Sequence, residues 1–183
     1  YPRGWQRIYS NNLSNVIDGY TMAKPLTPAL GAEQFAFSLN GGLTLRGYRG
    51  EVADGTPLVL LHSINAAPSA MEMRPLFEYY RDKRPVWVPD LPGFGLSDRP
   101  DVTYSSGLYA RWLAEWLESL EQPADVVALS LTGEFMARAI LEQGAKVRSL
   151  SLISPTGMGM RVPPKAPNGS RVDRFLSSPW VGR

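Results

Sequence analysis

The feature that most constrains the fold is an alternation of short apolar runs with longer amphipathic segments. Each run is bounded by Pro, Gly, Asp or Ser, and continuous apolar runs are typical of parallel strands that are covered on both faces. The four runs are Leu58–Leu61, Val86–Val88, Val126–Leu129 and Leu150–Ile153. Because strands that alternate with helices form right-handed crossover units, the pattern predicts an α/β fold: a doubly wound, mostly parallel sheet with helices on both faces.

The segments between the runs predict three helices, because their apolar residues recur at helical spacing. The clearest places Tyr109, Leu113 and Trp116 on one face, with Arg111 and Glu115 on the opposite face. The predicted helices span about residues 70–82, 105–121 and 131–143. Their aromatic and Met side chains are therefore expected to fill the core.

Two strands are predicted to precede the apolar runs as an antiparallel hairpin. Residues 35–39 and 43–48 flank Asn40-Gly41-Gly42, and these turn residues tolerate positive φ. Residues 1–33 have no regular spacing and are expected to form an irregular arm. The core is thus predicted over residues 34–157 with six strands, and residues 158–183, rich in Pro and Gly, are expected to begin a cap or lid.

Composition excludes several classes of protein. The 183 residues are 44% hydrophobic and 20% charged, which favours a folded globular chain, and no apolar stretch approaches the roughly 18 residues that span a membrane. The absence of Cys and the single His exclude thiolate and His-cluster metal sites. The Gly93-x-Gly95 pair lacks the third glycine of a dinucleotide loop, so we expect no cofactor.

Charge and the first residue bear on partners and location. Residues 146–183 are basic, but no nucleic-acid-binding motif accompanies that charge, so no nucleic-acid partner is expected. The lack of Cys leaves the compartment open, and a cytoplasmic location is the default expectation. Since the chain starts at Tyr1 and not at Met, this expectation allows for a removed N-terminal segment.

The loops after the apolar runs are the expected place for chemistry, since ligands bind beyond the carboxyl ends of parallel strands. One of these loops, at Ser130, lies between a predicted strand and a predicted helix, with the small residues Ala128 and Thr132 two positions away on either side. Such an elbow lifts the Ser hydroxyl out of the sheet and directs the next backbone N–H toward an oxyanion site. A Ser that caps an ordinary helix would give the same local pattern.

Three motifs in register carry a resemblance to a known family. They are Leu60-Leu-His-Ser-Ile-Asn65, Asp90-Leu-Pro-Gly-Phe-Gly-Leu-Ser97 and Leu129-Ser-Leu131. Over roughly residues 34–157 the chain resembles the α/β-hydrolase family. The resemblance implies that Ser130 is the nucleophile, that the backbone N–H groups of Ile64 and Leu131 form the oxyanion hole, and that His62, Asn65 and Asp90 shape the loops beside it.

The implied reaction is acyl transfer from a small-molecule carbonyl substrate, by default an ester, to Ser130 and then to water. The family's catalytic acid and His come after the nucleophile, yet no His follows Ser130, and after Ile153 no carboxylate occurs before Asp173. We therefore expect a serine hydrolase whose acid and His are missing from this chain, and expect residues 1–183 alone to be inactive. The alternative is a non-catalytic binding module with the same fold.

The last predicted strand, residues 150–153, would be an exposed apolar edge if the sheet ended there. Natural proteins usually cover or charge such edges. We therefore expect a missing C-terminal segment or a second copy of the chain to cover it.

Overall fold

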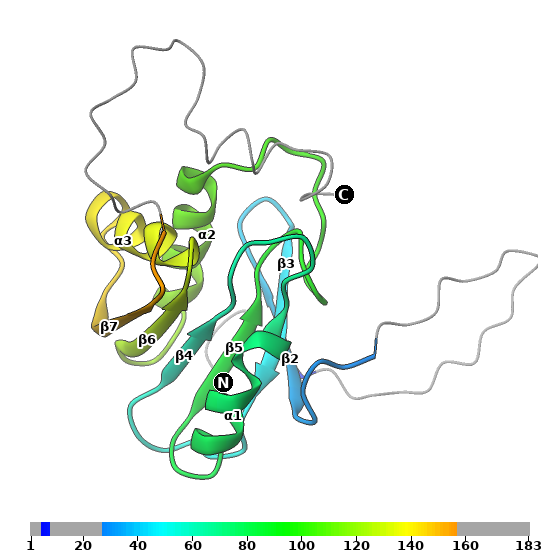
Figure 1. The fold of residues 1–183 in the computed structure, drawn as a ribbon, viewed down its shortest axis with the longest axis vertical. Coiled ribbons are helices and arrows are strands. Elements are labelled where there is room, and N and C mark those ends of the chain that lie inside the picture. Colours follow the sequence, from blue (N-terminus) through cyan, green and yellow to red (C-terminus); the bar gives the residue numbers. More distant parts are fainter. Residues whose placement is uncertain (1–4, 8–26, 157–183) are drawn as a thin grey trace, which may run out of the picture.

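All the segments predicted as strands lie in one sheet, flanked by helices on both faces (Figure 1). The computed structural model describes residues 5–7 and 27–156. Its strands are β1 (Trp5–Arg7), β2 (Glu33–Ser38), β3 (Thr44–Arg49), β4 (Leu58–Leu61), β5 (Val86–Asp90), β6 (Ala124–Leu129) and β7 (Val147–Ile153). Its helices are the 3₁₀ turn η1 (Ala70–Met73), α1 (Arg74–Tyr80), α2 (Ser106–Glu118) and α3 (Thr132–Gln143). The predicted fold class is confirmed.

The strand order is β1-β2-β3-β5-β4-β6-β7. Strands β2 and β3 form the predicted antiparallel hairpin, in which the Leu39 N–H donates to the Leu43 carbonyl over 2.8 Å. The turn contains Gly41 and Gly42 at φ angles of 88° and 81°, a region that glycine enters without a steric penalty. Strand β3 is antiparallel to β5, whereas β5, β4, β6 and β7 are parallel, as the apolar runs predict.

One part of the expectation for the N-terminal arm is wrong. Residues Trp5–Arg7 form β1, which pairs antiparallel with β2, so the described sheet has seven strands and not six. A three-residue strand is too short to produce a readable alternation in the sequence, and its partner is the free edge of the hairpin. The predicted cap, residues 158–183, lies outside the described residues.

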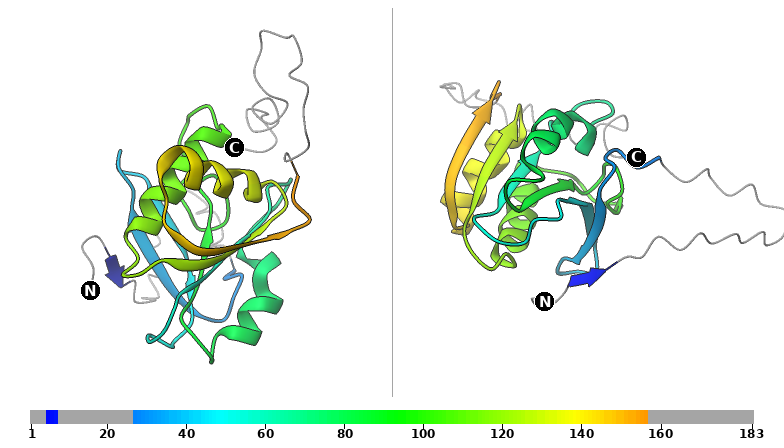
Figure 2. Two further views of the ribbon diagram at one scale, coloured as in Figure 1. Left: turned by 90° about the vertical axis from the view of Figure 1, so that its left-hand side faces the viewer. Right: turned by 90° about the horizontal axis from the view of Figure 1, so that it is seen from below.

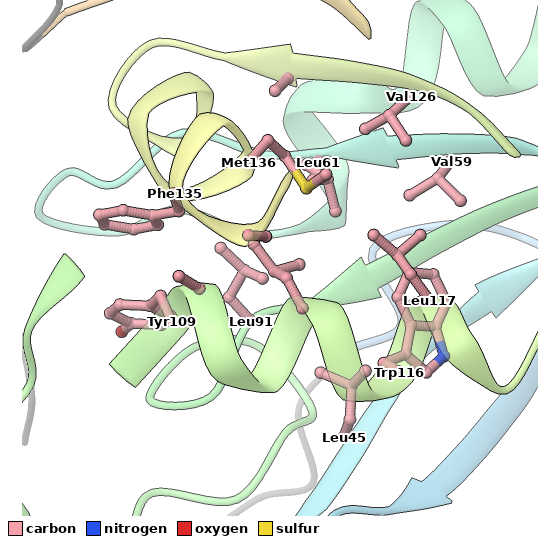
Figure 3. Close-up of a cluster of buried hydrophobic side chains, with 14 of the residues drawn as sticks. Leu45, Val59, Leu61, Leu91, Tyr109, Trp116, Leu117, Val126, Phe135 and Met136 are labelled. Atoms are coloured by element: carbon pink, nitrogen blue, oxygen red, sulfur yellow. The ribbon is translucent and has the colours of Figure 1, made fainter. Parts of the chain in front are cut away.

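Two apolar clusters cover the two faces of the sheet. On one face, Phe77 of α1 and Met73 pack against Leu58 and Leu60 of β4. On the other face α2 and α3 pack together over the sheet, and Figure 3 shows their side chains meeting those of the strands. There Tyr109 stacks on Phe135 with ring centroids 4.7 Å apart and planes 4° apart.

Strand β7 lies at the edge of the sheet, beside β6 (Figure 2). Within the described residues it pairs only with β6, and its Leu152 and Ile153 side chains are 37% and 39% exposed. At the other end of this strand pair the register shifts by one residue between Ala124 and Asp125. The shift brings Arg148 and Ser149 onto the buried Asp125 carboxylate.

The parallel pairing sets the location of the candidate site. Leu61 at the end of β4 pairs with Ala128 near the end of β6, and β4 also pairs with β5. The loops that follow these three strands therefore leave the same edge of the sheet.

Candidate functional site

The turn between β6 and α3 holds Ser130 in a left-handed conformation. Its φ angle is 57°, which for a residue other than glycine costs roughly 1–3 kcal/mol and persists only where surrounding structure imposes it. The Ser130 N–H donates to the Ile153 carbonyl over 2.9 Å, and its carbonyl accepts from the Gly133 N–H over 3.2 Å. These bonds fix the turn while the side chain stays half-exposed at the sheet edge.

The small residues two positions either side of Ser130 are both fully buried, because the strand and the helix approach each other closely here. Thr132 has a specific contact: its hydroxyl donates a 2.6 Å hydrogen bond to the carbonyl of His62. This bond ties the elbow to the loop after β4. The sequence indicated only that residue 132 had to be small.

His62 is fully buried and both of its ring nitrogens are engaged. Nε2 accepts a hydrogen bond from the Leu91 N–H over 2.9 Å, so Nδ1 carries the proton and donates to the Ser63 carbonyl at 2.6 Å. Burial lowers the pKa of this imidazole, and the negative charges of Asp90 and Glu72 and the bond to Ser63 oppose that shift only in part. The ring is therefore a neutral bridge between two loops, with neither nitrogen free to accept a proton from a substrate or from Ser130.

Asp90 organises the loop after β5. Its carboxylate accepts from the Ala70 N–H over 2.7 Å and from the Leu96 N–H over 2.9 Å, and the Ser97 hydroxyl donates to its backbone carbonyl. Gly95 has a φ of 47°, and a Cβ there would lie 2.1 Å from the Asp90 side chain. Asp90 thus occupies the space inside the turn, and its carboxylate bonds to the backbone N–H groups of Ala70 and Leu96.

Two backbone N–H groups near the elbow are left without an acceptor. Among the described residues no hydrogen bond is donated by the N–H of Ile64 or of Leu131, although these residues are only 6% and 8% exposed. Both N–H groups can therefore donate to a ligand, and they lie in the two loops that follow β4 and β6. Leu131 also precedes α3, whose N-terminus favours negative charge.

The Ser130 hydroxyl has one side-chain neighbour at hydrogen-bond range, the Thr156 hydroxyl at 3.5 Å. Within residues 27–156 no carboxylate or imidazole bonds to it. In the same part of the chain no group of three or more potential metal ligands occurs. No described helix is both long and apolar enough to cross a membrane.

Glu72 is a polar residue of this region that the sequence analysis did not identify. Its carboxylate accepts from the Ser63 N–H at 2.7 Å, the Ser63 hydroxyl at 2.9 Å and the exposed Asn65 amide at 2.7 Å. The sequence did carry a signal, since Ser69-x-x-Glu72 matches a capping box. Ser69 caps η1 as that motif predicts, but Glu72 reaches the preceding loop.

A cavity among the described residues is at the opposite end of the sheet. It has a volume of about 620 Å³ and is lined by residues that precede β4 and β5, including Pro57 and Pro85, and by Ser119–Gln122 after α2. Since β4 and β5 are parallel to β6, this cavity adjoins their amino ends, away from Ser130.

The fold and the strained Ser turn define an α/β protein with a Ser at the carboxyl edge of its parallel strands. The sequence profile of the alpha/beta hydrolase family matches residues 58–182, and the chain belongs to this family. It is 30% identical over 115 residues to the 1-acylglycerol-3-phosphate O-acyltransferase ABHD5 of Mus musculus, a match that covers 60% of this chain and 32% of that protein. The chain thus spans about a third of the length of this relative.

Solved structures resemble the same part of the fold. An alpha/beta hydrolase fold protein from Burkholderia ambifaria is 26% identical with a TM-score of 0.60, covering 76% of this chain and 48% of its own. A probable hydrolytic enzyme from Pseudomonas aeruginosa PAO1 is 23% identical with a TM-score of 0.61, covering 74% of this chain and 45% of its own. The second likeness concerns the fold alone.

Proposed function

We propose that the protein is a serine hydrolase in which Ser130 attacks a carbonyl carbon and forms an acyl-enzyme. The observation that carries this proposal is the φ of 57° at Ser130, at a strand-to-helix turn in a member of a hydrolase family. A strained backbone at a half-exposed hydroxyl costs stability without improving packing, which favours a functional explanation over a simple helix cap. The φ angle also distinguishes this turn from an ordinary cap, whose Ser has an extended backbone like that of Ser105 before α2.

The proposed oxyanion hole consists of the N–H groups of Ile64 and Leu131. When the Ser130 oxygen bonds to the carbonyl carbon, the carbonyl oxygen acquires negative charge, and two fixed N–H donors stabilise it. Losing one such donor typically raises the barrier by about 2.7–4 kcal/mol. The open N–H groups support this assignment, as do the bonds that His62, Asp90 and Thr132 make between the three loops.

The proton from Ser130 requires a general base, which His62 is badly placed to be. It is the single His of the 183 residues, it is buried, and both ring nitrogens are committed to backbone groups. We propose that the catalytic His and its orienting acid are absent from this sequence and that residues 1–183 alone do not turn over esters. A base is needed because a Ser hydroxyl is a weak nucleophile at neutral pH.

The proposed substrate is a small-molecule acyl compound, with an ester as the default. The name of the mouse relative, an O-acyltransferase, supports acyl chemistry, since transfer to an alcohol and hydrolysis differ only in which hydroxyl attacks the acyl-enzyme. Carbon–carbon bond hydrolysis is accessible to the same arrangement, because one fold hosts many reactions.

A fluorophosphonate probe tests the nucleophile. In the complete protein the probe should label Ser130, identified by peptide mass spectrometry, and Ser130→Ala should abolish labelling. Equal labelling of the Ala variant contradicts the assignment. Labelling of a longer protein but not of residues 1–183 would support the proposal that the base is absent from this chain.

The second candidate is a non-catalytic binding module. The observation that favours it is that, among the described side chains, the Ser130 hydroxyl is within hydrogen-bond range only of Thr156. A complete protein that fails to react with the fluorophosphonate, yet binds an acyl ligand at the elbow, would select this alternative.

A further inference from the structure

The loop that carries Ile64 is bonded to a single carboxylate, that of Glu72 on η1. Glu72 of η1 accepts three hydrogen bonds of 2.7–2.9 Å, two from Ser63 and one from Asn65. Asn65 in turn donates to the Ser63 hydroxyl over 2.7 Å and accepts from the Ala67 N–H over 2.9 Å. Hydrogen bonds to a charged group are roughly twice as strong as neutral ones, so this cluster is the main restraint on residues 63–67 from the η1 side.

These contacts determine how the Ser63–Ile64 peptide is oriented and therefore where the Ile64 N–H points. The Ser63 N–H is taken by Glu72, and the Ser63 carbonyl is taken by the His62 ring. Every described peptide bond is trans, so the Ile64 N–H points opposite to the Ser63 carbonyl and therefore away from the His62 ring. With both neighbours fixed, the Ser63–Ile64 peptide has one orientation available.

We propose that Glu72 is a positioning residue for the oxyanion hole: its carboxylate holds the N–H and the hydroxyl of Ser63 and thereby fixes the direction of the Ile64 N–H, the proposed loop donor. The inference rests on the proposed function, because an oxyanion donor matters only if Ser130 performs acyl transfer. Glu72 acts through the loop and is not itself a catalytic residue. His62 holds the carbonyl of the Ser63–Ile64 peptide, and Glu72 holds the N–H and the hydroxyl of Ser63, which come just before that peptide.

The chemistry of the cluster requires a carboxylate. All three partners donate, and an ionised carboxylate accepts through both oxygens. Gln at position 72 can still accept from the Ser63 N–H through its one oxygen. Its amide nitrogen would then face the Ser63 hydroxyl and the Asn65 amide, so one donor would face another. The loop should shift in Glu72→Gln although the size of the side chain is preserved.

The test measures ester hydrolysis by the complete protein with short-chain p-nitrophenyl esters. Glu72→Gln is expected to lower kcat by about 100-fold, the loss associated with a misplacement of about 1 Å, and to change KM far less. Glu78→Gln is the matched control and should leave kcat unchanged, since Glu78 lies on the adjacent helix α1 and its side chain is 45% exposed, with a 3.4 Å ion pair to Arg81. Circular dichroism checks that each variant is folded.

If Glu72→Gln does not fold, Asn65→Ala removes the loop side of the same contact at an exposed position, and should lower kcat in the same direction by a smaller factor. A wild-type kcat in whichever variant folds overturns the role of Glu72. The Ser130→Ala variant separates the two proposals. Activity that survives Ser130→Ala overturns the proposed function itself, whereas activity lost in Ser130→Ala but intact in Glu72→Gln overturns only the positioning role.

Discussion

The hydroxyl of Thr132 donates a 2.6 Å hydrogen bond to the carbonyl of His62, a residue 70 positions earlier in the chain. Both residues are fully buried, so the bond joins the turn after β6 to the loop after β4 inside the core. These are the two loops that carry the proposed oxyanion donors, Leu131 and Ile64. Their separation therefore depends on a side chain two residues beyond the proposed nucleophile.

Replacing Thr132 by Val should destabilise the protein, because the two side chains have nearly the same shape and only the donor is lost. The His62 carbonyl would be left buried without its partner, which typically costs about 1–3 kcal/mol. Urea denaturation of wild type, Thr132→Val and the control Thr132→Ser measures the free energies of unfolding. Thr132→Ser keeps the hydroxyl and should lose less stability than Thr132→Val. A Thr132→Val variant as stable as wild type would contradict the role of this hydrogen bond.

Replacing Ser130 by Gly should stabilise the fold relative to Ser130→Ala while both variants lose probe labelling. Gly adopts a φ of 57° without the steric cost that Ala retains, and relief of such strain is worth on the order of 1 kcal/mol, partly offset by the greater freedom of Gly in the unfolded chain. Thermal or urea denaturation compares the two variants directly. If Ser130→Gly is the less stable of the pair, the turn is not strained.

The sheet was predictable from the sequence because its central strands are covered on both faces and leave continuous apolar runs. The hairpin was predictable because Gly41 and Gly42 are needed for its turn. The strand Trp5–Arg7 was missed because three residues contain too little pattern. The convergence of the loops was predictable from strand direction, but the identity of the restraining groups was not.

Glu72 and the Thr132 hydroxyl illustrate that limit. Their hydrogen-bond partners lie 9 and 70 residues away, and no local spacing specifies such partners. Periodicity reports on which face of an element is buried, whereas a bond between two loops depends on tertiary geometry. The Ser69-x-x-Glu72 pattern even points to a local cap that Glu72 does not form.

Asp125 should make the fold acid-sensitive at the amino ends of β6 and β7. Hydrogen bonds from Arg148, and then from Ser149 and Arg84, outweigh its burial and hold the pKa of this carboxyl well below its usual range. A folded-state pKa below the unfolded value contributes stability above about pH 4, which is lost as the pH falls through the folded value.

Asp125→Asn should therefore lower the free energy of unfolding by about 1–3 kcal/mol at pH 7, as expected for lost hydrogen bonds to a charged group. Between pH 7 and pH 3 the free energy of unfolding of this variant should fall less than that of wild type. Asp82→Asn is the control, because the Asp82 side chain is 88% exposed with only a 3.9 Å ion pair. Denaturation at pH 7 and pH 3 gives both quantities. A variant as stable as wild type at pH 7 would contradict this role.

The edge strand β7 should acquire a partner. Its outer edge is unpaired among the described residues, and Leu152 and Ile153 are exposed beside it, an arrangement that promotes strand addition. We expect the partner to be a later segment of the complete protein or a second copy of the chain. Light scattering of residues 1–183 should show self-association that Leu152→Lys prevents, while a monomer whose Leu150 and Leu152 amides exchange as slowly as those of β4 would contradict the expectation.

His62 should make the protein less stable as the pH falls below about 6.5, the ordinary pKa of an unfolded imidazole. Burial lowers the pKa of the folded imidazole, against the opposing charges of Asp90 and Glu72, so the unfolded chain binds a proton at a pH where the folded chain does not. The free energy of unfolding should therefore fall, by at most about 1.4 kcal/mol per pH unit, between the unfolded and folded pKa values. Nε2 accepts a hydrogen bond from the Leu91 N–H. Protonation of Nε2 would place a second N–H on the ring, so that two donors would face each other.

The sequence contains no other His, so a slope of stability between pH 6.5 and the carboxylate range has one expected source. Urea denaturation at half-unit pH intervals, together with the ring-proton NMR shifts of His62, measures the slope and the titration in the same protein. His62→Gln is the control, and its stability should be flat across this interval even if it is lower throughout. A wild-type slope that persists in His62→Gln, or a ring that titrates at or above 6.5 in the folded state, would show that the imidazole is not the neutral bridge between the Ser63 and Leu91 loops.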